Sequence, residues 1–175
     1  MTGDAALVES LIATIPDFPA PGIVFRDLTP VFAHGPALQA LGRALAEPFE
    51  GSYDTIAGLE ARGFLIAGAA GALSGTGVLT VRKAGKLPRA VLKREYALEY
   101  GTAAFEVHAG ELPPGSRVLI VDDVLATGGT VCAAADLIEA AGWEVAGIAV
   151  ALELAGLGGR ERIGDRASVF SLLSY

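Results

Sequence analysis

The sequence predicts an α/β fold with a central, mainly parallel sheet flanked by helices. From about residue 54 onward, short apolar segments alternate with segments of helical pattern, which is typical of a parallel sheet covered on both faces. The chain of 175 residues fits one domain and is long enough to bury a core. No linker, internal repeat or low-complexity tract divides it, so residues 1–175 are expected to form a single domain.

The N-terminal third begins with helical periodicity. Apolar residues recur at helical spacing within 4–14 and again within 36–47, and each segment is expected to be a helix. Between them, residues 16–30 (PDFPAPGIVFRDLTP) contain four prolines, which exclude a helix or a central strand. This stretch is expected to be an ordered loop with a buried apolar run at Ile23–Phe25.

The remaining elements follow the alternation. The expected strands are 54–59, 77–82, 117–121 and 144–153, and the expected helices lie at 64–73 and within 126–142. The segment 83–101 interrupts the pattern because it is long, polar and charged without a sustained period.

Composition and charge exclude several classes of protein. Hydrophobic residues make up 52% and charged residues 19% of the chain, which argues against disorder. The net charge of −7 disfavours nonspecific binding to nucleic acid or anionic membranes. Cys132 is the only cysteine, so no intramolecular disulfide or cysteine cage is available. The acidic start lacks a basic, then apolar leader, and no apolar window is long enough to span a membrane, so a cytoplasmic protein is expected.

Residues 118–130 (VLIVDDVLATGGT) carry the most chemical information. An apolar strand delivers Asp122 and Asp123 to its carboxyl end, where open α/β sheets bind their ligands. The loop 126–130 then opens a helix, and its glycines, hydroxyls and free amide groups suit a phosphate. Acids beside a phosphate loop predict a sugar-phosphate site, with the acids facing the ribose hydroxyls. The alternative is that the acids cap a helix and the glycines make a turn, but two acids after a buried strand are costly without a purpose.

Other nucleotide-binding loops fit less well. The Walker pattern is missing because Gly85-Lys86 is followed by leucine and lacks the upstream glycine, and no G-x-G-x-x-G follows a strand. The run 118–130 instead resembles the phosphoribosyl pyrophosphate motif of type I phosphoribosyltransferases. The resemblance implies that family's fold, with ribose hydroxyls on Asp122 and Asp123. It also implies that the 5-phosphate is held by the loop residues Ala126, Thr127, Gly128, Gly129 and Thr130.

Three further segments resemble the adenine phosphoribosyltransferases of that family. In the first, 16–30, an aromatic ring in a proline-framed loop can stack on a flat base. The resemblance implies that Phe25 stacks on adenine, that main-chain groups of Val24 and Arg26 read its polar edge, and that residues 1–35 form a base-binding hood. The alternative is that Phe25 only anchors the loop in the core.

The second segment is GLEARGF (58–64). By resemblance it is the pyrophosphate loop, with a cis peptide at Glu60–Ala61 and with Arg62 serving the pyrophosphate. The alternative for Arg62 is a surface ion pair with Glu60 or Asp54. Many members of this family have Asp where this chain has Glu60, a difference that is not expected to change the chemistry.

The third segment, 81–108, contains the cations Arg82, Lys83 and Lys86, which suit a pyrophosphate leaving group but also fit an ordinary solvated face. The resemblance implies that residues 83–103 form a flexible lid, with Glu99 near the base and Tyr100 over the reaction centre. At the C-terminal end, ELAGLGGRERI and FSLLSY also resemble the family, with Leu154 lining the base pocket.

The resemblance implies the reaction of adenine with phosphoribosyl pyrophosphate to give AMP and pyrophosphate. Glu99 is the candidate acid or base. Mg²⁺ is expected on substrate oxygens and water, near Asp122 and Asp123, with no direct protein ligand. A homodimer is expected, with helix 64–74 contributing to its packing, and no nucleic acid or membrane partner. Other purine bases or orotate, and a phosphoribosyl pyrophosphate sensor that binds nucleic acid, are the alternatives. The missing helix-turn-helix and the complete pyrophosphate loop and lid argue against the sensor.

Overall fold

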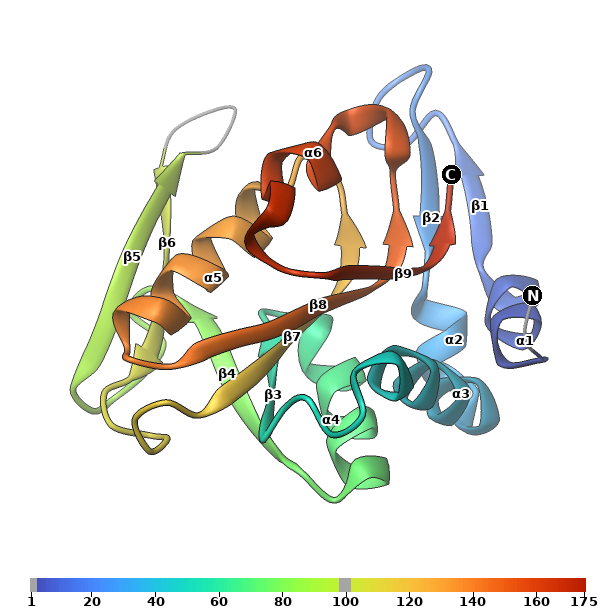
Figure 1. Cartoon of the computed structure of the whole chain (residues 1–175). Helices are drawn as coiled ribbons and strands as arrows, with labels where there is room; N and C mark the ends of the chain where they lie inside the picture. Colours follow the sequence, from blue (N-terminus) through green and yellow to red (C-terminus); the bar gives the residue numbers. More distant parts are fainter. Residues whose placement is uncertain (1–2, 98–101) are drawn as a thin grey trace.

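A computed structural model describes residues 3–97 and 102–175 (Figure 1). In this part of the chain, a seven-stranded sheet has the order β5-β6-β4-β3-β7-β8-β9. Neighbours from β4 to β9 are parallel, whereas β6 pairs antiparallel with β4 and with β5. The strands are β3 (Thr55–Leu59), β4 (Gly77–Lys83), β5 (Val91–Ala97), β6 (Thr102–His108), β7 (Arg117–Leu125), β8 (Glu144–Glu153) and β9 (Val169–Ser174). The predicted mainly parallel α/β sheet is therefore confirmed.

Helices cover both faces of the sheet (Figure 1). The helices are α1 (Gly3–Leu11), α2 (Thr29–Ala33), α3 (Gly35–Ala46), α4 (Gly63–Ser74), α5 (Gly129–Ala140) and α6 (Gly159–Ile163). One apolar cluster joins the faces of α1, α3 and α4 to the sheet, with Leu41, Ile66 and Leu119 fully buried. A second cluster joins α5 to the opposite face through Leu137, Ile138 and Ile120. Each β-strand of the centre is thus buried on both sides, which explains its continuous apolar sequence.

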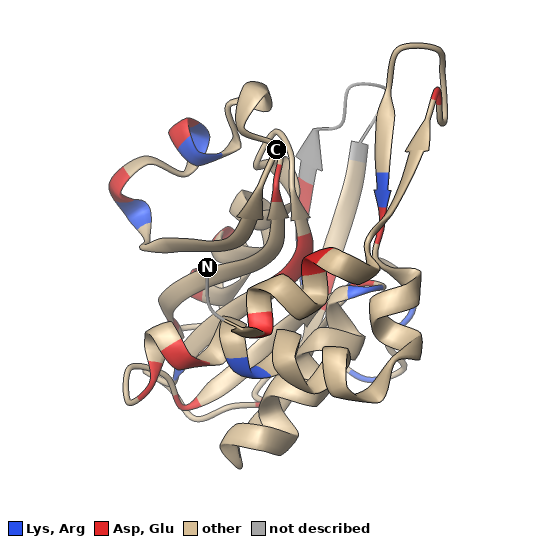
Figure 2. Cartoon of the chain, turned by 90° about the vertical axis from the view of Figure 1, so that its right-hand side faces the viewer, with Lys and Arg blue, Asp and Glu red and all other residues tan. Residues whose placement is uncertain are grey.

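The proline-rich segment forms a hairpin rather than a simple loop. β1 (Ala13–Pro16) and β2 (Val24–Asp27) pair antiparallel as a separate two-stranded sheet, which stands above the carboxyl ends of the central strands (Figures 1 and 2). The expected buried run was wrong, because Ile23 and Val24 are 47% and 50% exposed. A two-stranded sheet that projects from the body has too few neighbours to bury both of its faces.

Two other expectations need correction. The strand expected at 117–121 continues to Leu125, so Asp122 and Asp123 belong to β7 itself and do not follow it. The polar segment after Lys83 supplies β5, which pairs with β6 along its whole length. The sequence did not predict this strand, because β5 lies at the edge of the sheet and its charged residues mask the apolar pattern of a strand. No helix of the described residues is long and apolar enough to cross a membrane.

Candidate active site at the carboxyl edge of the sheet

Two adjacent carboxylates lie near the carboxyl end of β7. Asp122 and Asp123 are only 8% and 7% exposed, and the backbone amide of Asp123 donates a 2.9 Å hydrogen bond to Asp122 Oδ1. Burial, and then the neighbouring charge of Asp123, raise the pKa of Asp122 well above its ordinary value. The pair is therefore costly for the folded protein unless a ligand uses it.

The start of α4 packs tightly against these acids. A Cβ atom at Gly63 would lie 2.9 Å from the Val121 carbonyl and 3.0 Å from Asp122 Oδ1. Glycine is the residue that permits this approach, and it brings the turn after β3 beside the acids. The Glu60–Ala61 peptide bond in this turn is cis, as the family resemblance implied.

Arg62 connects the turn to the acids. Its Nε lies 2.7 Å from Asp123 Oδ2, so the surface ion pair considered for Arg62 has a different partner from the two expected. Asp54 instead pairs with Arg117 at 2.7 Å, at the amino end of β3. The guanidinium of Arg62 also lies 6.0 Å from the ring centre of Phe25, within the range of a cation–π contact.

The loop after β7 surrounds a small cavity at the start of α5. Residues 124–131 line a cavity of about 60 Å³. Gly128 has a φ of +76°, a conformation that favours glycine, and it precedes the first helical residue, Gly129. The first amide groups of a helix lack intrahelical acceptors, so the cavity is edged by donors that an anion can use.

The basic cluster is arranged by two carboxylates. Glu60 Oε2 accepts hydrogen bonds from Arg82 Nε at 3.3 Å and from the amide of Lys83 at 2.9 Å. Glu106, which is 4% exposed, accepts from the amides of residues 85, 86 and 87 at 3.0, 2.7 and 2.8 Å. These backbone hydrogen bonds lower the pKa of Glu106. The side chains of Lys83 and Lys86 are exposed.

Phe25 lies on the hairpin near Arg62, and its ring contacts a second aromatic ring. The ring centres of Phe18 and Phe25 lie 5.3 Å apart at an angle of 70°. The guanidinium of Arg26 stacks 4.2 Å from the ring centre of Tyr175. One edge of β2 pairs with β1, and the other has no strand partner among the described residues, which leaves main-chain groups beside Phe25 for a ligand.

Leu154 lies at the end of β8, where its amide donates a 2.9 Å hydrogen bond to the Leu125 carbonyl. It is half-buried, beside the start of the phosphate loop. Glu99 and Tyr100, the expected catalytic pair, lie outside the described residues.

Sequence reasoning missed three residues of this region. Glu106 sits inside an apolar strand, and an isolated acid there could have indicated a role for its carboxylate. Phe18 belongs to the same proline-framed segment as Phe25, so its aromatic character was a usable sign. Tyr175 lies far from Arg26 in sequence, and nothing in the sequence pairs them.

The residues present suit a Mg²⁺ ion that is carried by a substrate. Among the described residues, no group of three or more His, Cys, Asp or Glu side chains is placed to hold a metal. The two carboxylates of β7 nevertheless offer oxygen atoms, the donor type that Mg²⁺ takes together with water and phosphate oxygens.

The fold is that of an α/β protein with two buried acids beside a helix start suited to an anion, and known proteins narrow that class. Residues 29–172 match the family described as phosphoribosyl transferase domain. An adenine phosphoribosyltransferase of Arthrobacter sp. (strain FB24) is 62% identical over 157 residues, which cover 90% of this chain and 85% of that protein. The chain therefore belongs to the adenine phosphoribosyltransferases, a branch of the phosphoribosyltransferase family.

Solved structures agree with this assignment. A crystal structure of adenine phosphoribosyltransferase from Rhodothermus marinus DSM 4252 has a TM-score of 0.89 and 44% identity, and covers 98% of both chains. The enzyme from Saccharomyces cerevisiae, complexed with an imino-altritol bisphosphate and adenine, has a TM-score of 0.91 and 39% identity, and covers 99% of this chain and 100% of that one.

Proposed function

We propose that this protein transfers the 5-phosphoribosyl group of phosphoribosyl pyrophosphate to adenine, forming AMP and pyrophosphate. The observation that carries the proposal is the run of contacts from Phe25 through Arg62 to Asp123. It joins the hairpin, the turn after β3 and the acids of β7 in one site. The reaction requires such a site, because the base, the pyrophosphate and the phosphoribosyl group must be bound together. The naming of its relatives as adenine phosphoribosyltransferases supports the same reaction.

The phosphoribosyl group is bound by β7 and the loop after it. Ala126, Thr127, Gly128, Gly129 and Thr130 take the 5-phosphate through amide and hydroxyl donors around the cavity. Asp122 and Asp123 face the ribose 2- and 3-hydroxyls. The raised pKa of Asp122 favours its protonated form, so the pair presents both a donor and an acceptor to these hydroxyls.

The pyrophosphate leaves toward the cations. Glu60, Ala61 and Arg62 form its loop, and Arg82, Lys83 and Lys86 add positive charge. Arg62 is already held by Asp123, so little reorganisation is needed when the negative charge of the leaving group develops. Mg²⁺, when bound to the substrate, neutralises part of the pyrophosphate charge.

The base lies against the hairpin. Phe25 stacks on adenine, main-chain groups of Val24 and Arg26 bind its polar edge, and Leu154 lines the pocket. Glu99 handles the proton of the attacking purine, and Tyr100 covers the reaction centre from the lid 83–103. Closure of that lid protects the activated sugar from water.

A homodimer and a cytoplasmic location complete the proposal. An apolar stripe on α4 includes Leu65 and Leu73, which are 51% and 50% exposed. Exposed leucines on a helix that begins at the active site favour a subunit interface there. The single cysteine leaves the fold independent of disulfides, which suits a reducing compartment.

The test is an assay of the purified protein with Mg²⁺, phosphoribosyl pyrophosphate and each purine base or orotate in turn. Formation of AMP and pyrophosphate from adenine, much faster than the products of the other bases, is the expected result. Faster reaction with another base would overturn the adenine pocket and leave the phosphate site intact. Tight binding of phosphoribosyl pyrophosphate without turnover on any base would favour a sensor.

A further inference from the structure

The short helix α6 is docked on the phosphate loop. A Cβ atom at Gly159 would collide with the Ala126 carbonyl, and one at Gly128 would lie 2.8 Å from the Gly159 carbonyl. Backbone therefore packs directly on backbone between the loop and the first residue of α6. The position of α6 is in this way coupled to the position of the loop.

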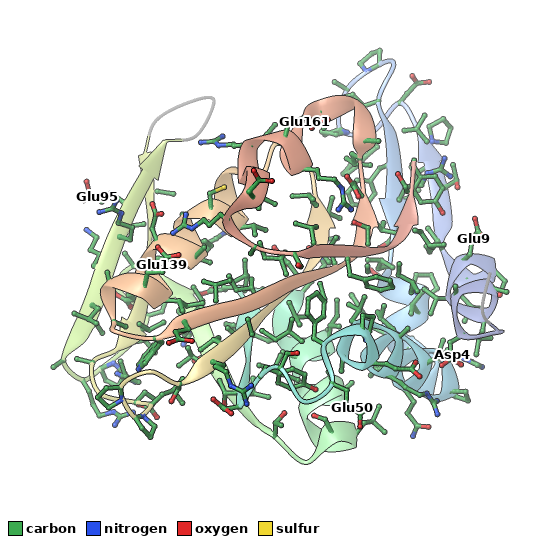
Figure 3. The ribbon with its side chains drawn as sticks, viewed as in Figure 1. Asp4, Glu9, Glu50, Glu95, Glu139 and Glu161 are labelled. Carbon is green, nitrogen blue, oxygen red and sulfur yellow. The ribbon has the colours of Figure 1, made fainter. Side chains whose placement is uncertain are left out.

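Arg160 anchors α6 to the sheet. Its Nε and Nη2 contact the two carboxylate oxygens of Glu153 at 3.0 and 2.5 Å, and its Nη1 donates to the Val169 carbonyl at 2.9 Å. Glu153 is 8% exposed and also accepts a 2.6 Å hydrogen bond from Ser171. A bidentate pair at a buried carboxylate fixes orientation well. In Figure 3, Glu161, the residue that follows Arg160, marks the place of α6 at the upper edge of the molecule.

Arg162 lies on the same helix, two residues further, against the phosphate loop. A Cβ atom at Gly129, the first residue of α5, would be 3.3 Å from Arg162 Nη1. The guanidinium therefore lies directly beside the start of α5. The backbone amide of Arg162 donates to the Gly158 carbonyl at 3.1 Å, but its side chain forms no ion pair, hydrogen bond or ring contact with the described residues. The nearby Arg166, in contrast, is paired with Asp136 at 2.6 Å and with Glu139 at 2.7 Å.

The phosphate loop needs a cation that its own sequence lacks. Residues 126–130 contain no lysine or arginine, and the nearby Arg62 is already paired with Asp123. A phosphate monoester carries nearly two negative charges at neutral pH. Amide donors bind such a group, and an adjacent cation adds charge-assisted hydrogen bonds to its oxygens.

We propose that Arg162 is a binding residue for the 5-phosphate, supplied to the loop from α6. The guanidinium, unpaired with the described residues, turns to the phosphate oxygens when the ligand enters, and the anchored Arg160 keeps α6 in place. This inference rests on the proposed function, because it requires a phosphoribosyl ligand in the loop.

The experiment compares ligands with and without the phosphate. AMP and adenosine are titrated calorimetrically into the wild-type protein, Arg162→Gln, Arg162→Lys and the control Arg43→Gln, whose arginine pairs with Asp4 away from the site. Arg162→Gln is expected to weaken AMP binding about tenfold, the usual size of a lost charged hydrogen bond, and to leave adenosine binding unchanged. Arg162→Lys should recover part of the loss. The difference should shrink below about pH 6, where the phosphate takes up its second proton.

Each other outcome decides against the inference. Unchanged AMP affinity in Arg162→Gln would overturn it, as would an equal loss of affinity for AMP and adenosine, which indicates a structural defect. The wild-type assay separates this failure from that of the proposed function. A wild-type protein that makes AMP while Arg162→Gln binds AMP normally refutes the role of Arg162 alone. A wild-type protein that neither binds AMP nor forms it refutes the proposed function.

Discussion

At the residue scale, several charged side chains of the site have partners before any substrate arrives. Arg62 pairs with Asp123, Arg82 with Glu60, and the amides after Lys83 with Glu106. Such pairing restricts the positions that these side chains can take. The buried carboxyl of Asp122, in contrast, has no ion-pair partner among the described residues.

Asp122→Asn is expected to stabilise the protein and to impair catalysis. The pKa of Asp122 is raised in the folded state, so the native state binds more protons than the unfolded state between the two pKa values, and wild-type stability falls as pH rises through that interval. Because asparagine does not ionise, Asp122→Asn should raise the free energy of unfolding at neutral pH by about 1 kcal/mol, which raises Tm by ~2–4 °C. Thermal unfolding from pH 3 to 8 measures it.

The control for that measurement is Asp54→Asn. Hydrogen bonds donated by Arg117 lower the pKa of Asp54, so the ionised Asp54 carboxylate stabilises the fold at neutral pH. This stabilisation is lost as the pH falls through the lowered pKa. The two variants should therefore shift Tm in opposite directions at pH 7. A decrease in Tm for Asp122→Asn at pH 7 would contradict the account of its buried carboxyl.

Phe25→Ala is expected to raise the KM for adenine at least tenfold and to leave the KM for phosphoribosyl pyrophosphate nearly unchanged. Stacking of a base on an aromatic ring contributes about 1–3 kcal/mol. Phe18→Ala is the matched variant, since Phe18 packs against Phe25 in a T-shaped pair and should act more weakly. Steady-state kinetics with each substrate varied in turn measure both effects. Equal effects on the two KM values would point to a loss of hairpin structure.

Glu99→Gln is expected to lower kcat by about 10²-fold or more while substrate binding changes little, because general acid–base catalysis contributes about that much. Glutamine keeps the shape of the side chain and removes the ionisable group. Single-turnover rates and equilibrium binding of phosphoribosyl pyrophosphate separate the two effects. Near-normal turnover of Glu99→Gln would contradict the assignment of Glu99 as the general acid or base.

At the scale of elements, the phosphate loop depends on the packing of β7, α5 and α6 around it. Gly128 is held in a left-handed conformation, while Gly159 lets α6 approach the loop without a gap. The shape of the loop therefore depends on three elements: β7 and α5, which flank it in the sequence, and α6, which comes later in the chain. Its geometry is a property of their contact as well as of the motif.

Gly159→Ala is expected to destabilise the protein by about 1–3 kcal/mol, the usual cost of overpacking, and to raise the KM for phosphoribosyl pyrophosphate. The added methyl would meet the Ala126 carbonyl and the side chain of Leu125. Gly156→Ala is the control, because a Cβ there has nothing within 4 Å. Urea unfolding and kinetics measure the changes. Identical behaviour of the two variants would show that α6 does not support the loop.

At the scale of the whole molecule, the sheet separates two apolar cores and collects the polar groups at its carboxyl edge (Figure 1). The hairpin lies over this edge, and α4 runs from it along one face. The outer side of α4 carries a stripe of exposed small and apolar residues, Leu65, Gly68, Ala72 and Leu73. Burial of this stripe in a second subunit would remove apolar surface from water.

Leu65→Lys is expected to shift the protein from dimer toward monomer. A lysine in the interface must lose its hydration or prevent close approach. Light scattering after size-exclusion chromatography, over a dilution series, measures the mass. Leu157→Lys is the control, with a leucine that is equally exposed, at 51%, outside α4. A wild-type protein that stays monomeric at every concentration would contradict the proposed dimer.

Much of the fold was determined by the sequence alone. Short apolar strands alternating with helical segments predicted the parallel sheet, and VLIVDDVLATGGT predicted a buried strand, two acids near its carboxyl end and a following helix. These predictions succeeded because local periodicity and glycine positions depend on neighbours along the chain. The same local reasoning failed for β5 and for the buried run at Ile23–Phe25, where exposure depends on which elements lie nearby.

The tertiary structure alone decided which charges meet. Arg62 had candidate partners close in sequence, yet it pairs with Asp123, and Arg26 stacks on the distant Tyr175. Arg162, which carries no motif, reaches the phosphate loop only because Gly159 lets α6 dock there. Long side chains choose partners by distance in space, and that distance follows from packing of the sheet, which no local pattern in the sequence encodes.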